Sequence, residues 1–156
     1  MSIYSQRIKD WLQSEKVDAE VLGFGQSVHS VEEAIEVSGY PLERITKTIV
    51  MLTQANDCVI AMVPADTRAS TERVRKILAL GERPRVASAE ETEKHVGQLV
   101  GGNSPLNAAN ATILIDPKLL EKDWIITGGG DNRHLVKISI EELKRVVVYT
   151  EARVRK

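Results

Sequence analysis

The sequence ITKTIVML at residues 45–52 and the sequence CVIAMV at residues 58–63 decide the fold of this chain. Both stretches are rich in β-branched and apolar residues, which favour strands. The residues between them, QAND at 54–57, are typical of a turn. Two such runs joined by a short turn predict a β-hairpin.

Helices and further strands are expected on both sides of this hairpin. Capping boxes, in which a serine and the acidic residue three positions later each cover a backbone N–H, are predicted at Ser30–Glu33, Ser88–Glu91 and Ser139–Glu142. Periodic apolar residues and these caps predict helices at residues 3–15, 30–39, 70–80 and 88–97, near Pro117 and after Ser139. Short apolar runs predict strands at residues 21–25, 84–87, 111–115, 124–127 and 135–138.

The order of these elements mixes hairpins with crossovers through helices, which disfavours a purely parallel, doubly wound sheet. We expect a mixed α/β (α+β) fold, in which six or seven short strands curl into a closed or nearly closed barrel surrounded by helices. The interior of a small barrel is filled by side chains except at its mouth, where ligand pockets commonly form. With 42% hydrophobic and 28% charged residues, residues 1–156 are expected to form a single domain.

The composition also indicates where in the cell the protein is located. Residues 1–16 mix apolar with charged residues, unlike a signal peptide. The longest apolar run, residues 58–65, is far shorter than the roughly 20 residues of a membrane helix. The single cysteine, Cys58, cannot form an internal disulfide. We expect a soluble, cytoplasmic protein with no membrane partner.

Three features suggest a site, and each has a structural alternative. Lys47 lies in a very apolar strand, so its ammonium group either reaches water along apolar surface or has a partner or a function there. The loop at Gly101, Gly102, Asn103, Ser104 and Pro105 either makes a tight turn or presents backbone N–H groups to an anionic or carbonyl oxygen.

The triplet Gly128-Gly129-Gly130 follows a predicted strand and allows close approach of a ligand, or else forms a flexible hairpin tip. Its spacing fits neither a dinucleotide-binding fingerprint nor a phosphate-binding loop. With a net charge of −1, any RNA binding must depend on local basic clusters. One cluster, residues 68–85, has six basic residues against two acidic ones, and another, residues 144–156, has five against one. The alternative is that the first cluster is a solvated helix face and the second an ordinary basic tail.

Other chemistries lack their usual residues. The three histidines, His29, His95 and His134, are scattered and Cys58 stands alone, so we expect no metal site and no cofactor. Cys58 lies in an apolar strand and is interpreted as a core residue. The sequence has no Gly-x-Ser-x-Gly elbow of a serine hydrolase.

The order of motifs resembles the YbaK / prolyl-tRNA synthetase-associated editing domain family. The resemblance covers about residues 20–147 and rests on SVEEA at 30–34, ITKTIV at 45–50, VGGNSPL at 100–106 and the glycines at 128–130. It implies a trans-acting aminoacyl-tRNA deacylase, which hydrolyses the ester of mischarged tRNA, with Ala-tRNA or Cys-tRNA for proline as the leading substrates. A synthetase is a further partner that it suggests.

The resemblance also implies roles for individual residues. Lys47 is the expected catalytic residue, acting by positioning or charge and not as a nucleophile. Substrate binding is expected from Thr48, Gly101, Gly102, Asn103, Ser104, Pro105, Gly128, Gly129 and Gly130. Arg73, Arg75 and Lys76 are candidate tRNA contacts. The alternatives are a non-catalytic tRNA- or synthetase-binding module of the same fold, and a small-ligand or nucleotide binder that uses Gly128–Gly130.

Overall fold

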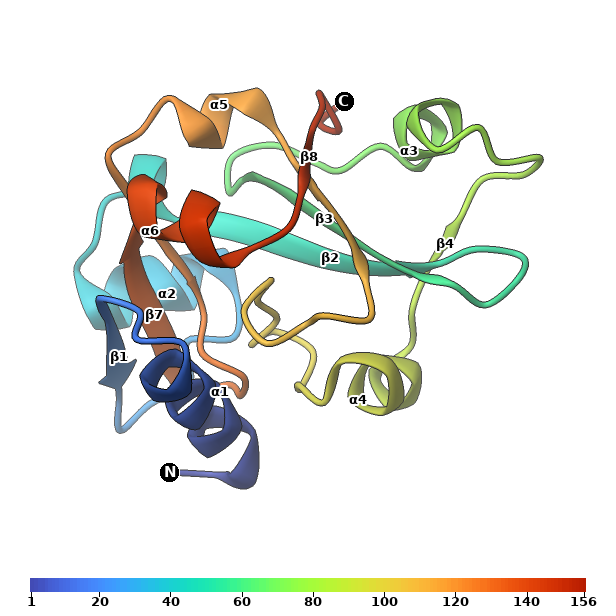
Figure 1. Ribbon diagram of the computed structural model, residues 1–156. Coiled ribbons are helices and arrows are strands. Elements are labelled where there is room, and N and C mark those ends of the chain that lie inside the picture. Colours follow the sequence, from blue (N-terminus) through green and yellow to red (C-terminus); the bar gives the residue numbers. More distant parts are fainter.

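The computed structural model describes residues 1–156 (Figure 1). Its helices are α1 (Ile3–Ser14), α2 (Val31–Ser38), the short 3-10 helix η1 (Leu42–Arg44), α3 (Thr71–Ile77), α4 (Ala89–Val96), α5 (Pro117–Leu120) and α6 (Ile140–Val146). Its strands are β1 (Ala19–Gly23), β2 (Thr46–Leu52), β3 (Cys58–Pro64), β4 (Arg85–Val86), β5 (Thr112–Ile115), β6 (Trp124–Gly128), β7 (His134–Ser139) and β8 (Thr150–Glu151). No helix combines the length and the apolar character needed to cross a membrane.

The predicted hairpin is confirmed and forms the middle of the larger sheet. Strand β2 pairs antiparallel with β3 from Thr46, opposite Pro64, to Leu52, opposite Cys58. Strand β4 pairs with the end of β2, and β5 pairs parallel to β3. All seven positions of β3 are buried, which explains why its sequence is continuously apolar instead of alternating.

The expected barrel is wrong, because the strands form two sheets and neither closes. One sheet has the order β1-β7-β6 and the other the order β4-β2-β3-β5-β8. Between them there is only an isolated parallel bridge from Ile45 to Ile126. A barrel needs a continuous hydrogen-bonded ladder at every seam. Here the Ile126 carbonyl accepts a bond from the Thr46 hydroxyl at 2.9 Å, and β2 pairs no further with β6.

The hairpin separates two apolar layers. One face contributes Ile60 and Met62 to the main core, against which α1 packs through Ile8 and Leu12. The other face contributes Val59, Ala61 and Val63 to a smaller cluster under α3. Figure 1 shows α3 and α4 on opposite sides of the long hairpin, with β1 and β7 at its other end.

Most predicted helix starts are confirmed. The capping boxes at Ser30–Glu33 and Ser88–Glu91 are both complete. The third is only half formed, because Ser139 accepts a bond from the Glu142 N–H but the Glu142 carboxylate instead binds the Asp18 N–H at 2.9 Å. Two features were not predicted from the sequence: a capping box between Ser2 and Ser5 in α1, and strand β8.

Candidate functional site

A cavity of about 290 Å³ opens where the two sheets separate. One wall follows the edge of β2, between the Ile45–Ile126 bridge and the pairing of Met51 with Val86 in β4. Strand β6, the start of α2 and the loop after α4 complete the lining. The polar side chains in this lining are His29, Ser30, Thr46, Lys47, Thr48, Thr92, Asn103 and Thr127.

The edge of β2 in this cavity carries backbone groups that no strand covers. The Val50 carbonyl accepts a hydrogen bond from the Ala87 N–H at 2.9 Å, so Val50 directs its backbone groups toward the β4 side. Backbone direction alternates along an antiparallel strand, and Thr48 therefore directs its N–H and carbonyl toward the same side. At Thr48, however, the cavity takes the place of a neighbouring strand.

Lys47 lies half-buried in the cavity wall. Its ammonium group donates one hydrogen bond, to the Thr67 carbonyl oxygen at 2.9 Å, and forms no ion pair. A lysine ammonium has three N–H donors, so two of them have no partner in the protein. Lys47 thus lines the cavity and keeps two N–H donors without a partner.

The loop after α4 brings only part of its predicted residues to the cavity. Gly101 and Asn103 line it, whereas Gly102, Ser104 and Pro105 do not. The N–H of Gly102 is bound to the Leu99 carbonyl at 2.9 Å, and the N–H of Ser104 to the Gln98 side-chain oxygen at 2.8 Å. The N–H groups of Gly101 and Asn103 have no such partner. These two are the only donors that remain from the four predicted ones.

The two glycine loops are locked together through their backbones. The Gly130 N–H donates to the Gly102 carbonyl at 2.8 Å, and the Leu99 N–H donates to the Gly130 carbonyl at 2.9 Å. A Cβ at Gly128 would lie 2.5 Å from the Gly102 carbonyl carbon and oxygen. Of the three glycines, Gly128 alone lines the cavity. Gly130 bonds to the other loop, whereas Gly129 packs against His134 and donates its N–H to the His134 carbonyl at 2.9 Å. The triplet is therefore held in place and is not a free hairpin tip.

A buried carboxylate fixes the turn after the triplet. Asp131 accepts bonds from the Arg133 N–H at 2.9 Å, from the His134 ring at 2.7 Å and from the Ser2 hydroxyl. Burial by itself raises the pKa of Asp131, but the hydrogen bonds from Ser2, Arg133 and His134 outweigh it and leave the pKa below its usual value. The ionised carboxylate ties the N-terminus of α1 to the glycine loop.

Two lining residues were not predicted as site residues. His29 packs directly over Gly101, which has a φ of +90° and no room for a Cβ. The sequence gives no signal for His29, because the other two histidines lie far from it in the chain. Thr127 is 1% exposed and lines the cavity from β6. Its position directly before the glycine triplet was the one available signal.

The remaining chemically active side chains lie elsewhere. Cys58 lies buried in β3 outside the cavity lining, and burial raises the pKa of its thiol. His95 and His134 also lie outside the lining. No three His, Cys, Asp or Glu side chains come together in the way a metal site requires.

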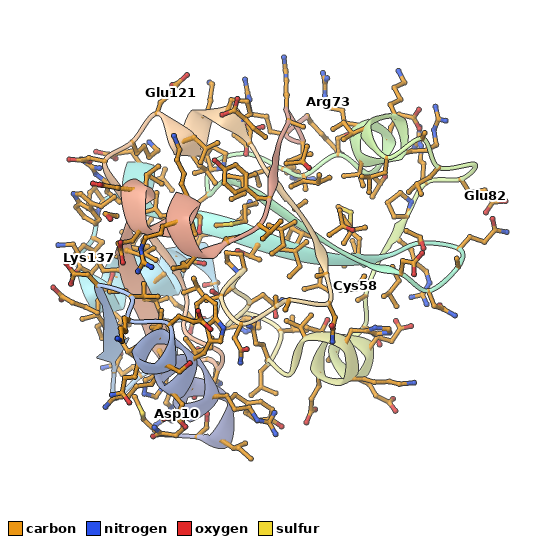
Figure 2. The ribbon with its side chains drawn as sticks, in the orientation of Figure 1. Asp10, Cys58, Arg73, Glu82, Glu121 and Lys137 are labelled. Atoms are coloured by element: carbon orange, nitrogen blue, oxygen red, sulfur yellow. The ribbon has the colours of Figure 1, made fainter.

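The predicted basic residues form a separate surface, which we call the α3 cleft. It is lined by Ser70, Thr71, Glu72, Arg73, Lys76, Arg83 and Lys156. Arg73 and Lys76 form no ion pair there, and Arg73 points outward from the molecule in Figure 2.

Arg75 is committed to the protein itself. It binds Glu72 with bonds of 2.9 and 2.5 Å, and Arg83 binds the same carboxylate at 2.7 Å. Hydrogen bonds from Arg75 and then Arg83 lower the pKa of Glu72 to about 2. Of the three predicted tRNA contacts, Arg73 and Lys76 remain available and Arg75 does not.

The chain is similar to proteins of known families. It is 25% identical over 125 residues to the proline–tRNA ligase of Solidesulfovibrio magneticus, a match that covers 80% of this chain and 22% of the ligase. The chain thus spans only about a fifth of that relative. It is 22% identical over 125 residues to the uncharacterized protein YwhH of Bacillus subtilis, a match that covers 80% of this chain and 78% of YwhH.

A solved structure shows the same fold over the whole chain. It is that of a protein whose proposed role is a trans-editing enzyme for prolyl tRNA synthetase, with a TM-score of 0.88 and 20% identity, covering 100% of this chain and 99% of that one. The aminoacyl-tRNA editing domain model matches residues 26–146, which include the cavity, both glycine loops and the α3 cleft except for Lys156. As its motifs predicted, the chain belongs to the aminoacyl-tRNA editing domain family.

Proposed function

We propose that the protein is a trans-editing hydrolase that cleaves the ester bond of mischarged aminoacyl-tRNA, with residues 1–156 acting as one domain. The observation that carries the proposal is the set of uncommitted donors around one cavity. Two N–H groups of Lys47 and the backbone N–H groups of Gly101 and Asn103 have no partner in the protein. Such donors suit a reaction in which negative charge develops on oxygen.

The proposed chemistry needs no protein nucleophile. An aminoacyl ester is already activated, so positioning and charge stabilisation suffice. Water adds to the carbonyl carbon and gives up a proton, and the bond to the ribose oxygen then breaks. If a hydroxyl of the substrate attacks first, water must then hydrolyse the new ester that this attack forms. The N–H groups of Gly101 and Asn103 hold the carbonyl oxygen while its charge develops. Lys47 holds the terminal ribose and stabilises the developing charge, and the ribose oxygen leaves as a hydroxyl after it takes up a proton.

The size of the cavity supports a small aminoacyl group. Its volume of about 290 Å³ is just below the 300–1,000 Å³ that is common for ligand pockets. Alanine or cysteine attached to the proline tRNA are the substrates we propose. One methyl group changes the free energy of apolar binding by only about 1–3 kcal/mol. The pocket must therefore distinguish between alanine and cysteine by its shape.

A panel of charged tRNAs tests this function. We expect the purified protein to release alanine or cysteine from the proline tRNA and to leave correctly charged Pro-tRNA intact. Release of radiolabelled amino acid, measured against the spontaneous rate, gives the result. Tight tRNA binding without any release would contradict the hydrolase and support a non-catalytic binding module instead.

The α3 cleft provides a separate prediction about tRNA binding. We propose that Arg73 and Lys76 contact phosphates, because both are free of ion pairs beside the same cleft. The double variant Arg73→Glu/Lys76→Glu is expected to weaken tRNA binding at least about tenfold. It should also reduce the dependence of log K on log salt by about 2, roughly one for each lost phosphate contact.

The control for this variant is Lys9→Glu. Lys9 is an exposed lysine of α1 that forms no ion pair and lies outside the α3 cleft. Fluorescence anisotropy with labelled tRNA at several salt concentrations compares the two proteins. Equal affinity for the cleft variant and the control would show that α3 is only solvated surface.

A further inference from the structure

Three buried polar atoms around the cavity have no hydrogen-bond partner in the protein. They are Thr48 Oγ1, Asn103 Oδ1 and Thr127 Oγ1, and they are the only such side-chain atoms in the chain. Their residues lie on β2, on the loop after α4 and on β6, and all three line the same cavity. If such atoms were distributed at random in the core, we would not expect all three to belong to residues of one cavity.

The neighbouring threonine shows that the fold can satisfy such a group. Thr46 lies two residues before Thr48 on the same face of β2, and its hydroxyl donates to the Ile126 carbonyl at 2.9 Å. A buried polar group without a partner destabilises the folded protein, because the group has given up its hydrogen bonds to water. Three such groups around one cavity therefore indicate a place that is built for a polar group of a ligand.

The chemistry of the three atoms narrows the ligand. An amide oxygen such as Asn103 Oδ1 can only accept a hydrogen bond, whereas the two threonine hydroxyls can donate or accept. The ligand group must therefore bring at least one N–H or O–H donor. A primary amine has the right complement, because two N–H groups bind Asn103 and one threonine while the other threonine donates to the nitrogen lone pair.

The charge of the cavity favours the neutral form of that amine. No aspartate or glutamate lines the cavity, and Lys47 already places a positive charge in its wall. A second cation would lack a counter-charge there. An α-amino group, whose pKa is ordinarily about 7.7–8.0, has a substantial neutral fraction near pH 7.5.

We propose that Thr48, Asn103 and Thr127 form the subsite for the α-amino group of the aminoacyl ester. This inference rests on the proposed function and adds the part of the substrate that the cavity recognises. The amine is held on the β6 side of the cavity, and the carbonyl oxygen lies against the backbone N–H groups of Gly101 and Asn103. Asn103 thus contacts both ends of the aminoacyl group, one through its side chain and one through its backbone.

Binding of two stable analogues tests the subsite. One is 3′-deoxyadenosine carrying an alanyl group through a 3′-amide, and the other carries a propanoyl group, which has the same carbon skeleton but no amine. Isothermal titration calorimetry gives both dissociation constants. We expect the wild-type protein to bind the alanyl analogue about tenfold more tightly or better, corresponding to one or two net hydrogen bonds.

Variants assign the preference to these residues. Thr127→Val keeps the shape of the side chain but lacks the hydroxyl, and it is expected to reduce the preference for the alanyl analogue to threefold or less. Thr127→Ser, which restores a hydroxyl, should retain it. The melting temperature of Thr127→Val should stay the same or rise, since it removes an unpaired buried hydroxyl. Thr48→Val provides the same test if Thr127→Val does not fold.

The outcomes separate this inference from the proposed hydrolase. Equal affinity of the wild-type protein for the two analogues would overturn the subsite, as would a full preference in both valine variants. A preference for the alanyl analogue without any release of amino acid from tRNA would overturn the hydrolase and leave the amine subsite standing.

Discussion

Replacing Lys47 by alanine is expected to reduce kcat/KM for ester cleavage by about 100-fold or more. Removing one preorganised donor to a developing oxyanion typically costs a factor of about 10²–10³ in rate. Lys47 offers two such donors and a positive charge at the cavity wall. Because the group acts on charge that develops during the reaction, kcat should fall more than KM rises. Release of amino acid from the tRNA that the wild-type protein cleaves best measures both constants.

The stability of this variant should change little. Lys47 makes one hydrogen bond, to the Thr67 carbonyl, and its loss costs about 1 kcal/mol. A matched control is Lys137→Ala, which removes another half-buried strand lysine, one that stacks 4.4 Å from the Trp124 ring and does not line the cavity. Figure 2 shows Lys137 at the left edge of the molecule and Arg73 at the top. If both variants kept wild-type rates, Lys47 would have no part in the reaction.

Replacing Gly128 by alanine is expected to destabilise the protein by about 3 kcal/mol and to abolish cleavage. The added Cβ would lie 2.5 Å from the Gly102 carbonyl carbon and oxygen. The Asn103 carbonyl oxygen lies closer still, and all three obstacles are backbone atoms, so relief requires the two glycine loops to move apart. Overpacking of this kind typically costs about 1–3 kcal/mol. Separating the loops also weakens the bond from the Gly130 N–H to the Gly102 carbonyl. Urea denaturation followed by circular dichroism gives the change in the free energy of unfolding.

Gly25→Ala is the control for this substitution. No atom lies within 4 Å of a Cβ at Gly25, and its φ is not in the left-handed region. Its free energy of unfolding should stay within about 0.5 kcal/mol of the wild-type value. A Gly128→Ala protein as stable as this control would mean that the loops tolerate separation and that their contact is not tight.

The sequence predicted the local elements well because their signals are local. The hairpin follows from two apolar runs and one turn, and the helix starts at Ser30 and Ser88 follow from residues three positions apart. Barrel closure failed because it depends on pairing between strands far apart in the chain. Ile45 and Ile126 form a single isolated bridge between the two sheets. The residues next to them in the sequence give no signal that the two strands pair no further.

The candidate site was predicted in part, for the same reason. Lys47 was recognisable because a lysine in an apolar strand conflicts with its surroundings. Thr127 was not, since threonine is an ordinary strand residue and only the opposing loop makes its hydroxyl buried and unpartnered. The commitment of the Ser104 N–H to the Gln98 side chain likewise depends on the folded loop.

The backbone contacts between the glycine loops make the main-chain donors independent of the side chains that line the rest of the cavity. The donors of Gly101 and Asn103 are parts of the main chain, and main-chain contacts between Gly102, Gly128 and Gly130 hold them in place. Side chains elsewhere in the cavity wall, such as Val31 and Ile49, are not part of those contacts. Under the proposed function, substitutions there would alter which amino acid fits without moving the main-chain donors proposed to act on the ester. The range of amino acids removed could then diversify by mutation while the reaction is preserved.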